Sequence, residues 1–137
     1  MQAATQTAPA GKLRVWAGRI ISAIPVLLLL FSAAMKLMKV PAAMQGFPHF
    51  GLPEHLAIPL GILELACAVI YAIPRTSVLG AILVTGYLGG ATAINVRIGE
   101  PWFMPVVLGV FAWAGLYLRD SRLRALLPLR SPADKQQ

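Results

Sequence analysis

Residues 54–96 read EHLAIPLGILELACAVIYAI-PR-TSVLGAILVTGYLGGATAINV. The two apolar blocks of this stretch, 54–73 and 76–96, are each about as long as a helix must be to cross the hydrocarbon core of a bilayer. Only Pro74 and Arg75 separate the blocks, so the chain must reverse direction there. The stretch therefore predicts a tight antiparallel hairpin of two membrane-spanning helices.

Two further apolar blocks flank this hairpin. The first covers about 16–35, contains Pro25, which is expected to kink it, and ends before Lys36. The last covers about 102–118, begins at Trp102 and is close to the lower limit of spanning length. With the hairpin, these blocks predict an all-α fold, an integral membrane four-helix bundle.

The composition of the whole chain agrees with this fold class. The 137 residues are 58% hydrophobic and 12% charged, with a mean hydropathy of +0.71. So short a chain cannot bury that much apolar surface in a core of its own, whereas lipid can solvate it directly. The basic residues that give the net charge of +7 lie between the apolar blocks and at the ends of the chain. They do not alternate with aromatic residues that could stack on nucleic-acid bases. These features favour a membrane protein and argue against a nucleic-acid partner.

The distribution of basic residues predicts the orientation of the chain. Four spans put the N-terminus, the Pro74-Arg75 turn and the C-terminus on one side of the membrane. Of the twelve basic residues, three lie on the other side, Lys36, Lys39 and Arg97, and nine lie on the first: Lys12, Arg14, Arg19, Arg75, Arg119, Arg122, Arg124, Arg130 and Lys135. By the positive-inside rule this bias predicts that both termini are cytoplasmic, N-in and C-in.

The segments outside the spans differ in character. We expect residues 1–15 to form a cytoplasmic tail in which 1–11 are disordered, 16–128 to form the membrane domain, and 129–137 to form a disordered tail. Prolines and glycines are expected to break regular structure in residues 40–53, which we place in the membrane interface as a cap. An alternative treats 16–35 as a cleaved signal peptide. We favour a retained span because three further spans follow it.

Glu64 is the most informative single residue. A carboxylate near the middle of a span is costly unless it is protonated, paired or wetted, so Glu64 should face the bundle interior. It shares one helix face with the small residues Ala57, Gly61, Cys67 and Ala68, and with Tyr71. Two roles stay open for Glu64, a catalytic acid or base and a hydrogen-bonded strut between helices.

A polar rim is expected at the non-cytoplasmic ends of the spans. The topology brings these side chains to one level: Lys36, His49, Glu54, His55, Asn95, Arg97 and Glu100. Glu64 lies about ten residues further into its span, about 15 Å by helical rise, which is too far for a direct contact with Lys36 unless the first helix tilts or water intervenes. The candidate ligand-binding residues of the rim and cavity are Lys36, Tyr71, Asn95 and Arg97. Snorkelling to lipid headgroups is the simpler role for Lys36 and Arg97.

The sequence offers little support for a metal site or for redox chemistry at a thiol. His49 and His55 are six residues apart without a Cys or a close Asp, so we expect no metal site. Cys67 is the single cysteine, which excludes an intramolecular disulfide. The chain also lacks a cofactor fingerprint, and we expect no covalently bound cofactor. Gly86 and Gly90 permit close helix contact, either within a compact bundle or in a homodimer.

Several stretches are similar to one known family. They are Leu60-Gly61-Ile62-Leu63-Glu64-Leu65, Ile73-Pro74-Arg75-Thr76, Gly80-Ala81-Ile82-Leu83, Gly86-Tyr87-Leu88-Gly89-Gly90-Ala91, Met35-Lys36-Leu37 and Trp113-Ala114-Gly115-Leu116-Tyr117-Leu118-Arg119-Asp120. By their order and spacing the chain resembles the DoxX-like membrane proteins from about 16 to 128. The resemblance implies a four-helix protein of the bacterial inner membrane. Members of the wider group are associated with quinone-linked sulfur oxidation, as in the small membrane subunit of thiosulfate:quinone oxidoreductase, and with membrane oxidoreductase complexes.

The preferred interpretation is a small accessory subunit of a redox-linked membrane complex. Its bundle would face lipid and other membrane subunits or a second copy of the chain, and it would hold a quinone or another apolar ligand near Glu64. One alternative is a stand-alone membrane enzyme or proton-coupled carrier that uses Glu64 as acid or base. A purely structural scaffold is the third.

Overall fold

The computed structural model describes residues 2–127, with side chains from Gly11 onward, so the predicted tail at 129–137 lies outside the described residues. Every regular element in this range is a helix, which confirms the all-α prediction. The α-helices are α1 (Gln2–Leu37), α2 (Pro41–His49), α3 (Ala57–Ala72), α4 (Ser77–Ile98), α5 (Phe103–Arg119) and α6 (Ser121–Leu126). Two short 3-10 helices, η1 (Glu54–Leu56) and η2 (Pro74–Thr76), precede α3 and α4.

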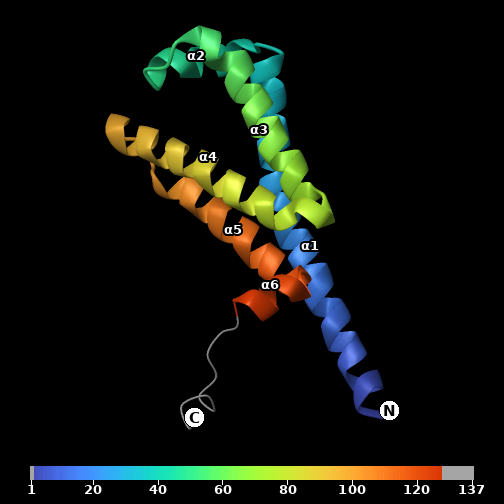
Figure 1. Ribbon diagram of the computed structural model, residues 1–137. Helices are drawn as coiled ribbons and strands as arrows, with labels where there is room; N and C mark the ends of the chain where they lie inside the picture. The colour runs from blue at the N-terminus through green and yellow to red at the C-terminus, as the bar shows by residue number, and fades with distance from the viewer. Residues whose placement is uncertain (1, 128–137) are drawn as a thin grey trace.

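The four long helices pack in a ring rather than around one central helix. Helix α1 packs against α3 and α5, and α4 packs against the same two helices. The pair α1–α3 and the pair α4–α5 lie close together near α6 and diverge toward the end that carries α2 (Figure 1). The η2 turn joins α3 to α4, so the tight hairpin predicted around Pro74 and Arg75 is confirmed.

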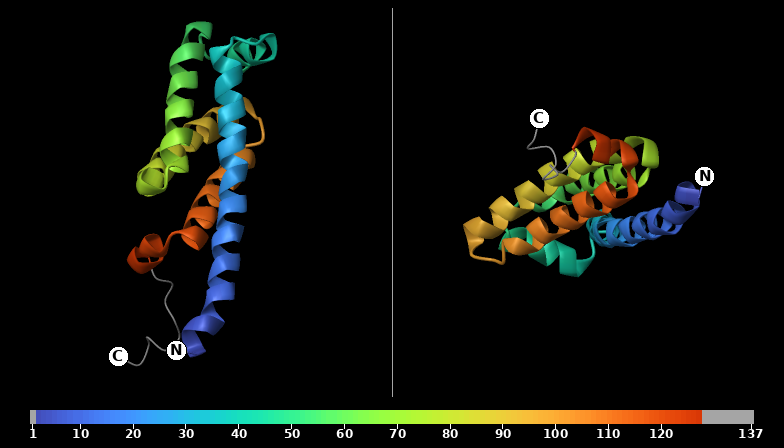
Figure 2. Two further views of the ribbon diagram at one scale, coloured as in Figure 1. Left: turned by 90° about the vertical axis from the view of Figure 1, so that its right-hand side faces the viewer. Right: turned by 90° about the horizontal axis from the view of Figure 1, so that it is seen from below.

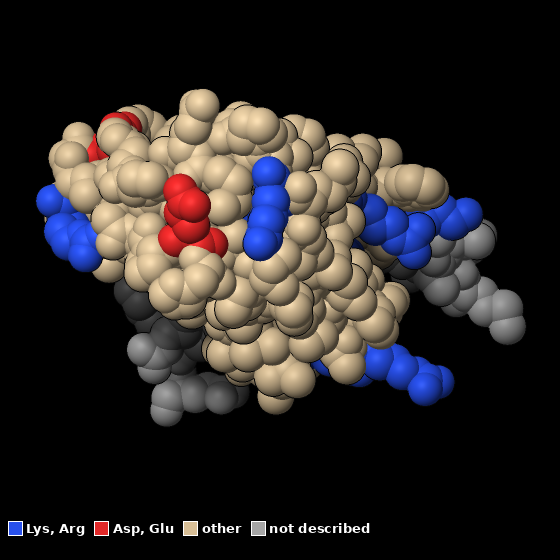
Figure 3. Space-filling view, turned by 90° about the horizontal axis from the view of Figure 1, so that it is seen from above, with Lys and Arg blue, Asp and Glu red and all other residues tan. Residues whose placement is uncertain are grey.

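The outer surface of the molecule is apolar. Large hydrophobic side chains are exposed on every long helix, among them Leu27, Phe31, Ile62, Ile82 and Val110. Three segments are long and apolar enough to cross a membrane, Gly11–Leu37, Glu54–Ala72 and Pro74–Ile98, and the shorter Phe103–Arg119 is also apolar. Seen from the α2 end, charged side chains are few and separated by uncharged surface (Figure 3). This surface suits a hydrocarbon solvent, in which the exposed side chains cost nothing.

Helix α1 is longer than the sequence predicts. It begins at Gln2 and not near residue 16, and its 36 residues give a length of about 54 Å. The first residues are rich in alanine, the strongest helix former, so the helix continues outward from the apolar segment. Its N-terminal part extends past α5 and α6 (Figure 2). The expectation that residues 1–11 are disordered is therefore wrong for the described part of that range, 2–11.

The connection between α1 and α3 also differs from the prediction. Instead of an irregular cap, residues 41–49 form α2. Pro41 occupies the first turn of α2, where its missing N–H costs no hydrogen bond. Left-handed backbone at Lys39 (φ 51°) and Gly51 (φ 71°) changes the chain direction on either side of the helix. A short helix with a turn at each end thus replaces the predicted loop.

Glycines set the closest helix contacts. A Cβ added to Gly115 on α5 would lie 2.7 Å from the Ser22 nitrogen and 2.9 Å from the Gly18 oxygen, both on α1. A Cβ on Gly80 of α4 would collide with the backbone of Tyr71 on α3. Such distances are shorter than real Cβ contacts, so only glycine lets these backbones approach.

A polar cluster joins four helices at the end of the bundle that lies near α6. We define the Arg119 cluster as Ser22, Tyr71, Ser77 and Arg119, from α1, α3, α4 and α5. The Arg119 Nε donates to Ser22 Oγ (3.0 Å), and its guanidinium lies 5.3 Å from the Tyr71 ring centroid. The Tyr71 hydroxyl donates to the Ala112 carbonyl (2.6 Å) and lies 3.0 Å from Ser22 Oγ. Because Ser22, Tyr71 and Ser77 are buried and Arg119 is half-buried, their mutual hydrogen bonds make the arrangement specific.

Helix α6 was not predicted from the sequence, and Asp120 begins it. The carboxylate accepts hydrogen bonds from the backbone N–H groups of Arg122 (2.8 Å) and Leu123 (3.4 Å), which caps the helix. Burial raises the pKa of Asp120, but the hydrogen bonds from Arg122 and Leu123 outweigh it and hold that pKa below its usual value. The buried Leu123 then docks α6 onto the core.

Gly115→Ala should destabilise the protein by about 1–3 kcal/mol, because the added methyl group must push α1 away from α5. Gly89→Ala on α4 is the matched control, since a Cβ there meets nothing within 4 Å. That control should be neutral or slightly stabilising because alanine is the better helix former. Thermal unfolding of both variants in detergent measures the difference. Equal midpoints would contradict the close approach of α1 and α5.

Candidate functional site

Glu64 faces the interior of the protein. The buried face of α3 consists of Ala57, Gly61, Glu64, Cys67, Ala68 and Tyr71, which confirms the predicted stripe. Glu64 is 2% exposed. A carboxylate so far from water requires a partner, because removing it from solvent costs several kcal/mol.

Lys36 of α1 supplies that partner. Its Nζ lies 2.7 Å from Glu64 Oε2 and donates at 2.5 Å to Ser32 Oγ, one turn earlier on α1. The Ser32 hydroxyl lies 3.2 Å from the same carboxylate oxygen. The Lys36 side chain is 19% exposed and that of Glu64 is 3% exposed, so the ion pair is largely removed from water.

The expectation that Lys36 lies too far from Glu64 is wrong, and Gly61 is the reason. A Cβ on Gly61 would lie 3.0 Å from the Leu37 side chain and 3.2 Å from Lys36 Cβ. The absence of a side chain at this position lets the last turn of α1 press against α3. The Lys36 stem then starts one helical turn from Glu64, a distance that its four methylene groups span easily.

The ion pair lies in the wall of a cavity. Its volume is about 710 Å³, and it lies between the α1–α3 and α4–α5 pairs where they diverge. Its polar wall residues are Ser32, Lys36, Glu64, Tyr87 and Asn95, and apolar side chains and glycines form the rest. Gly86 and Gly90 of α4 keep this space open, since a Cβ at either position meets nothing within 4 Å. Ligand pockets in proteins commonly combine an apolar lining with a few placed polar groups.

Tyr87 is the further polar residue close to the carboxylate. Its phenol lies within electrostatic reach of Glu64 from the α4 side of the cavity. Within the described residues the geometry of a full hydrogen bond to Glu64 is met by Lys36 and Ser32, and not by Tyr87. Tyr87 therefore adds a hydroxyl on the α4 side of the cavity, but it is not part of the hydrogen-bond network of Ser32, Lys36 and Glu64.

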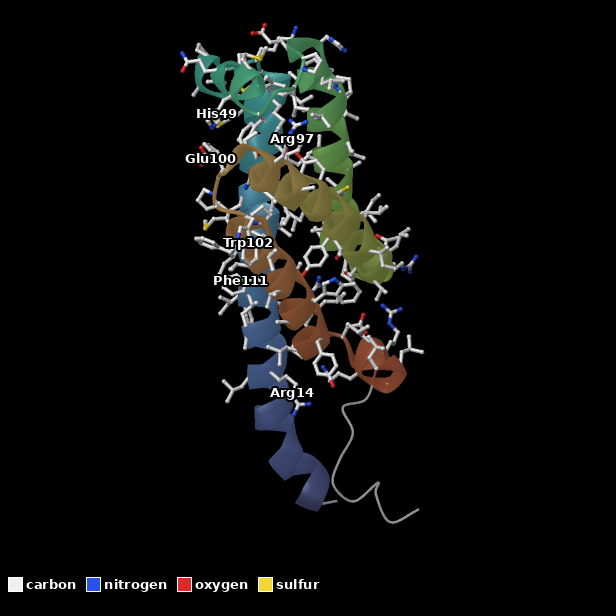
Figure 4. All side chains as sticks on the ribbon, turned by 90° about the vertical axis from the view of Figure 1, so that its left-hand side faces the viewer. Arg14, His49, Arg97, Glu100, Trp102 and Phe111 are labelled. Atoms are coloured by element: carbon white, nitrogen blue, oxygen red, sulfur yellow. The ribbon has the colours of Figure 1, made fainter. Side chains whose placement is uncertain are left out.

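Helix α2 forms part of the cavity wall at the open end of the bundle, with Ala42, Ala43, Gly46, Phe47 and Phe50 in the lining. Two polar contacts attach it to the α4–α5 hairpin. His49 Nε2 lies 2.8 Å from Glu100 Oε1, and Arg97 Nη2 donates to the Phe50 carbonyl at 2.5 Å. Figure 4 shows His49 on α2 above Glu100 in the connection from α4 to α5. Both side chains of the His49–Glu100 pair are exposed, so the pair adds little stability by itself.

The structure brings together only part of the predicted site. Lys36 and Asn95 line the cavity with Glu64, and the Asn95 amide also donates to the Pro101 carbonyl (3.0 Å). Arg97 lies at the rim and binds the carbonyl of Phe50, directly after α2, instead of lining the cavity. Tyr71 is 1% exposed and belongs to the Arg119 cluster, so it does not reach the cavity.

Sequence reasoning missed three residues of these networks. Ser32 lies one helical turn before Lys36, a spacing that could have signalled a shared face. Tyr87 lies among glycines, which leave its ring free to face a cavity. Arg119 follows the last apolar block, and the sequence indicates only that it is one of the nine basic residues of the cytoplasmic side, since nothing in the sequence places it beside Tyr71. No group of three or more His, Cys, Asp or Glu side chains in the described residues could hold a metal ion.

The apolar outer surface, the order of the helix contacts and the buried polar pair define a class, a small helical membrane protein with a cavity between its helices. The sequence profile of the DoxX-like family matches residues 20–115, which is more than half of the chain. The chain belongs to the DoxX-like family. No curated protein and no solved structure matches it.

Lys36→Met should destabilise the protein by about 3 kcal/mol, because it leaves the Glu64 carboxylate buried without its charged partner. The double variant Lys36→Met/Glu64→Leu removes both charges and should recover most of that loss. Lys39→Met is the matched control, since Lys39 is an exposed lysine of the same segment. Unfolding in mixed micelles measures all three variants. If Lys36→Met is as stable as the parent chain, the Lys36–Glu64 pair does not contribute to the stability of the fold.

Proposed function

We propose that this protein is a small accessory subunit of a redox-linked membrane complex and that its cavity binds a quinone or another apolar ligand. The observation that carries the proposal is an apolar cavity of about 710 Å³ with the Lys36–Glu64 pair in its wall. Pockets for small organic ligands have volumes of roughly 300–1,000 Å³. The cavity is thus large enough for a ring with part of an apolar tail.

The lining fits the two parts of such a ligand. Phe31, Met35, Leu60, Leu63 and Leu108 offer apolar contacts for a ring and tail. Lys36 offers an ammonium donor for a polar oxygen at the other end of the ligand. When bound, a quinone would supply electron transfer, and this chain would supply its binding and orientation.

The outer surface supports partners within the bilayer. Large apolar side chains exposed on it, among them Leu27, Ile82 and Val110, can pack against a helix of another subunit or of a second copy. The bias of basic residues supports an orientation with both termini in the cytoplasm of a bacterium, and the family supports the inner membrane as the location.

Gly90→Phe should weaken the binding of a short-chain quinone such as decylubiquinone by about tenfold or more, because the ring would fill the cavity. Gly89→Phe is the matched control. Gly89 is the neighbouring glycine with equally open space, but it does not line this cavity. Binding is measured with the tagged chain purified in mild detergent, and the same preparation should contain other membrane subunits. Absence of quinone binding and of any partner would contradict the proposal.

The second candidate is acid–base chemistry at Glu64, as in a proton-coupled carrier or a stand-alone enzyme. It is favoured by a carboxylate that is buried and yet reaches a cavity large enough for a substrate. Such chemistry needs a group that ionises, whereas a strut needs only hydrogen bonds.

Glu64→Gln separates these roles. The amide keeps the shape and still accepts a hydrogen bond, but it leaves the Lys36 ammonium without its counter-charge, so a strut should survive in the folded protein with a stability loss of about 3 kcal/mol, as for Lys36→Met. A proton-transfer role should lose about 100-fold or more in rate, at an unchanged amount of inserted protein. The rate is measured in the complex that co-purifies with the chain. An unchanged rate would exclude acid–base work by Glu64 and favour a scaffold or binding role.

A further inference from the structure

The hydrogen bonds of the Lys36–Glu64 pair leave one donor and one acceptor unused. A lysine ammonium has three N–H donors, and Lys36 directs one to Glu64 Oε2 and one to Ser32 Oγ. Glu64 Oε2 receives both contacts of the carboxylate, from Lys36 and from Ser32. Within the described residues no hydrogen bond reaches Glu64 Oε1, and the third N–H of Lys36 has no acceptor. Both residues line the cavity, so a molecule inside it can reach these two groups.

The two unused groups have opposite requirements. The third Lys36 N–H needs an acceptor, and Glu64 Oε1 needs a donor. A water molecule meets both needs at once, since it donates and accepts. A ligand that excludes water from these groups loses affinity unless its own polar group can make both hydrogen bonds.

This requirement distinguishes the polar heads that a ligand could carry. A carbonyl or ether oxygen accepts from Lys36 but offers Glu64 Oε1 no donor of its own in a largely apolar site, which is costly. A carboxylate head would be repelled by Glu64, and an ammonium head by Lys36, because the pair already balances its own charges. A hydroxyl group alone among these heads donates to one partner and accepts from the other without adding charge.

We propose that the cavity selects an apolar ligand with a hydroxyl head, which donates to Glu64 Oε1 and accepts from Lys36 Nζ. This inference rests on the proposed function, in which the cavity binds an apolar ligand. For a quinone and its reduced form, it assigns the tighter binding to the hydroxyl-bearing quinol. Tyr87, beside the carboxylate, lies where it can contact the same hydroxyl or the ring that carries it.

The test compares two ligands that differ only at the head. The probes are 4-decylphenol and its methyl ether, 4-decylanisole, because both have the same tail and ring and neither changes redox state on binding. The phenol donates and accepts, whereas the ether only accepts. Equilibrium binding to the purified full-length chain in detergent gives both dissociation constants. We expect the phenol to bind about tenfold or more tightly, as for a hydrogen bond to a charged group.

The variants locate this preference at the ion pair. Lys36→Met/Glu64→Leu removes both polar groups without leaving a buried charge, so the two probes should bind it with similar affinity. Thr92→Val is the matched control, since Thr92 lies on α4 in a separate groove between α4 and α5. In that control the preference for the phenol should stay as in the parent chain.

The outcomes separate the inference from the function on which it rests. Equal affinity of the parent chain for both probes would overturn the hydroxyl head and leave the ligand cavity in place. Binding of neither probe would remove the ligand cavity itself, and the inference with it. A preference that persists in the double variant would also overturn the inference, because the hydroxyl would then be recognised elsewhere.

Discussion

The architecture depends on the close contact of four helices around the Arg119 cluster. Glycines at positions 18, 80 and 115 remove the side chains that would separate the backbones, and the cluster then ties one group from each helix to its neighbours. Apolar side chains alone could not specify this contact, because lipid tails solvate them as well as another helix does. Polar groups can, since each would be left unpaired in hydrocarbon if the helices separated.

The helices are joined at this end and diverge at the other. Their divergence leaves the cavity, which is bounded by both helix pairs and by α2. The helices thus pack tightly at the end near α6 and leave open space at the end near α2. A binding site is held in shape best when rigid elements of this kind support it. The glycines of α4 that face the cavity do not bring helices together; they leave the space empty.

The ion pair between α1 and α3 connects the fold to the site. Burial of an unpaired, ionised Glu64 would cost several kcal/mol, so the carboxylate depends on Lys36, and Lys36 reaches it because Gly61 lets α1 come close. The pair cancels its own charge, which makes the cavity neutral although two charged groups line it. Its unused hydrogen-bonding groups, rather than a net charge, then distinguish one ligand head from another.

The sequence by itself determined the helical class, the suitability for a membrane, the turn at Pro74-Arg75 and the inward face of α3. These features depend on the length, hydropathy and periodicity of local segments, which are present before the chain folds. Only the tertiary structure decided that Lys36 reaches Glu64, that Tyr71 belongs to the Arg119 cluster and not to the cavity, and that α2 forms between α1 and α3. These outcomes depend on how closely two backbones approach and where they diverge. That geometry is set by pairs of residues distant in the chain, such as Gly18 with Gly115, and no local pattern encodes it.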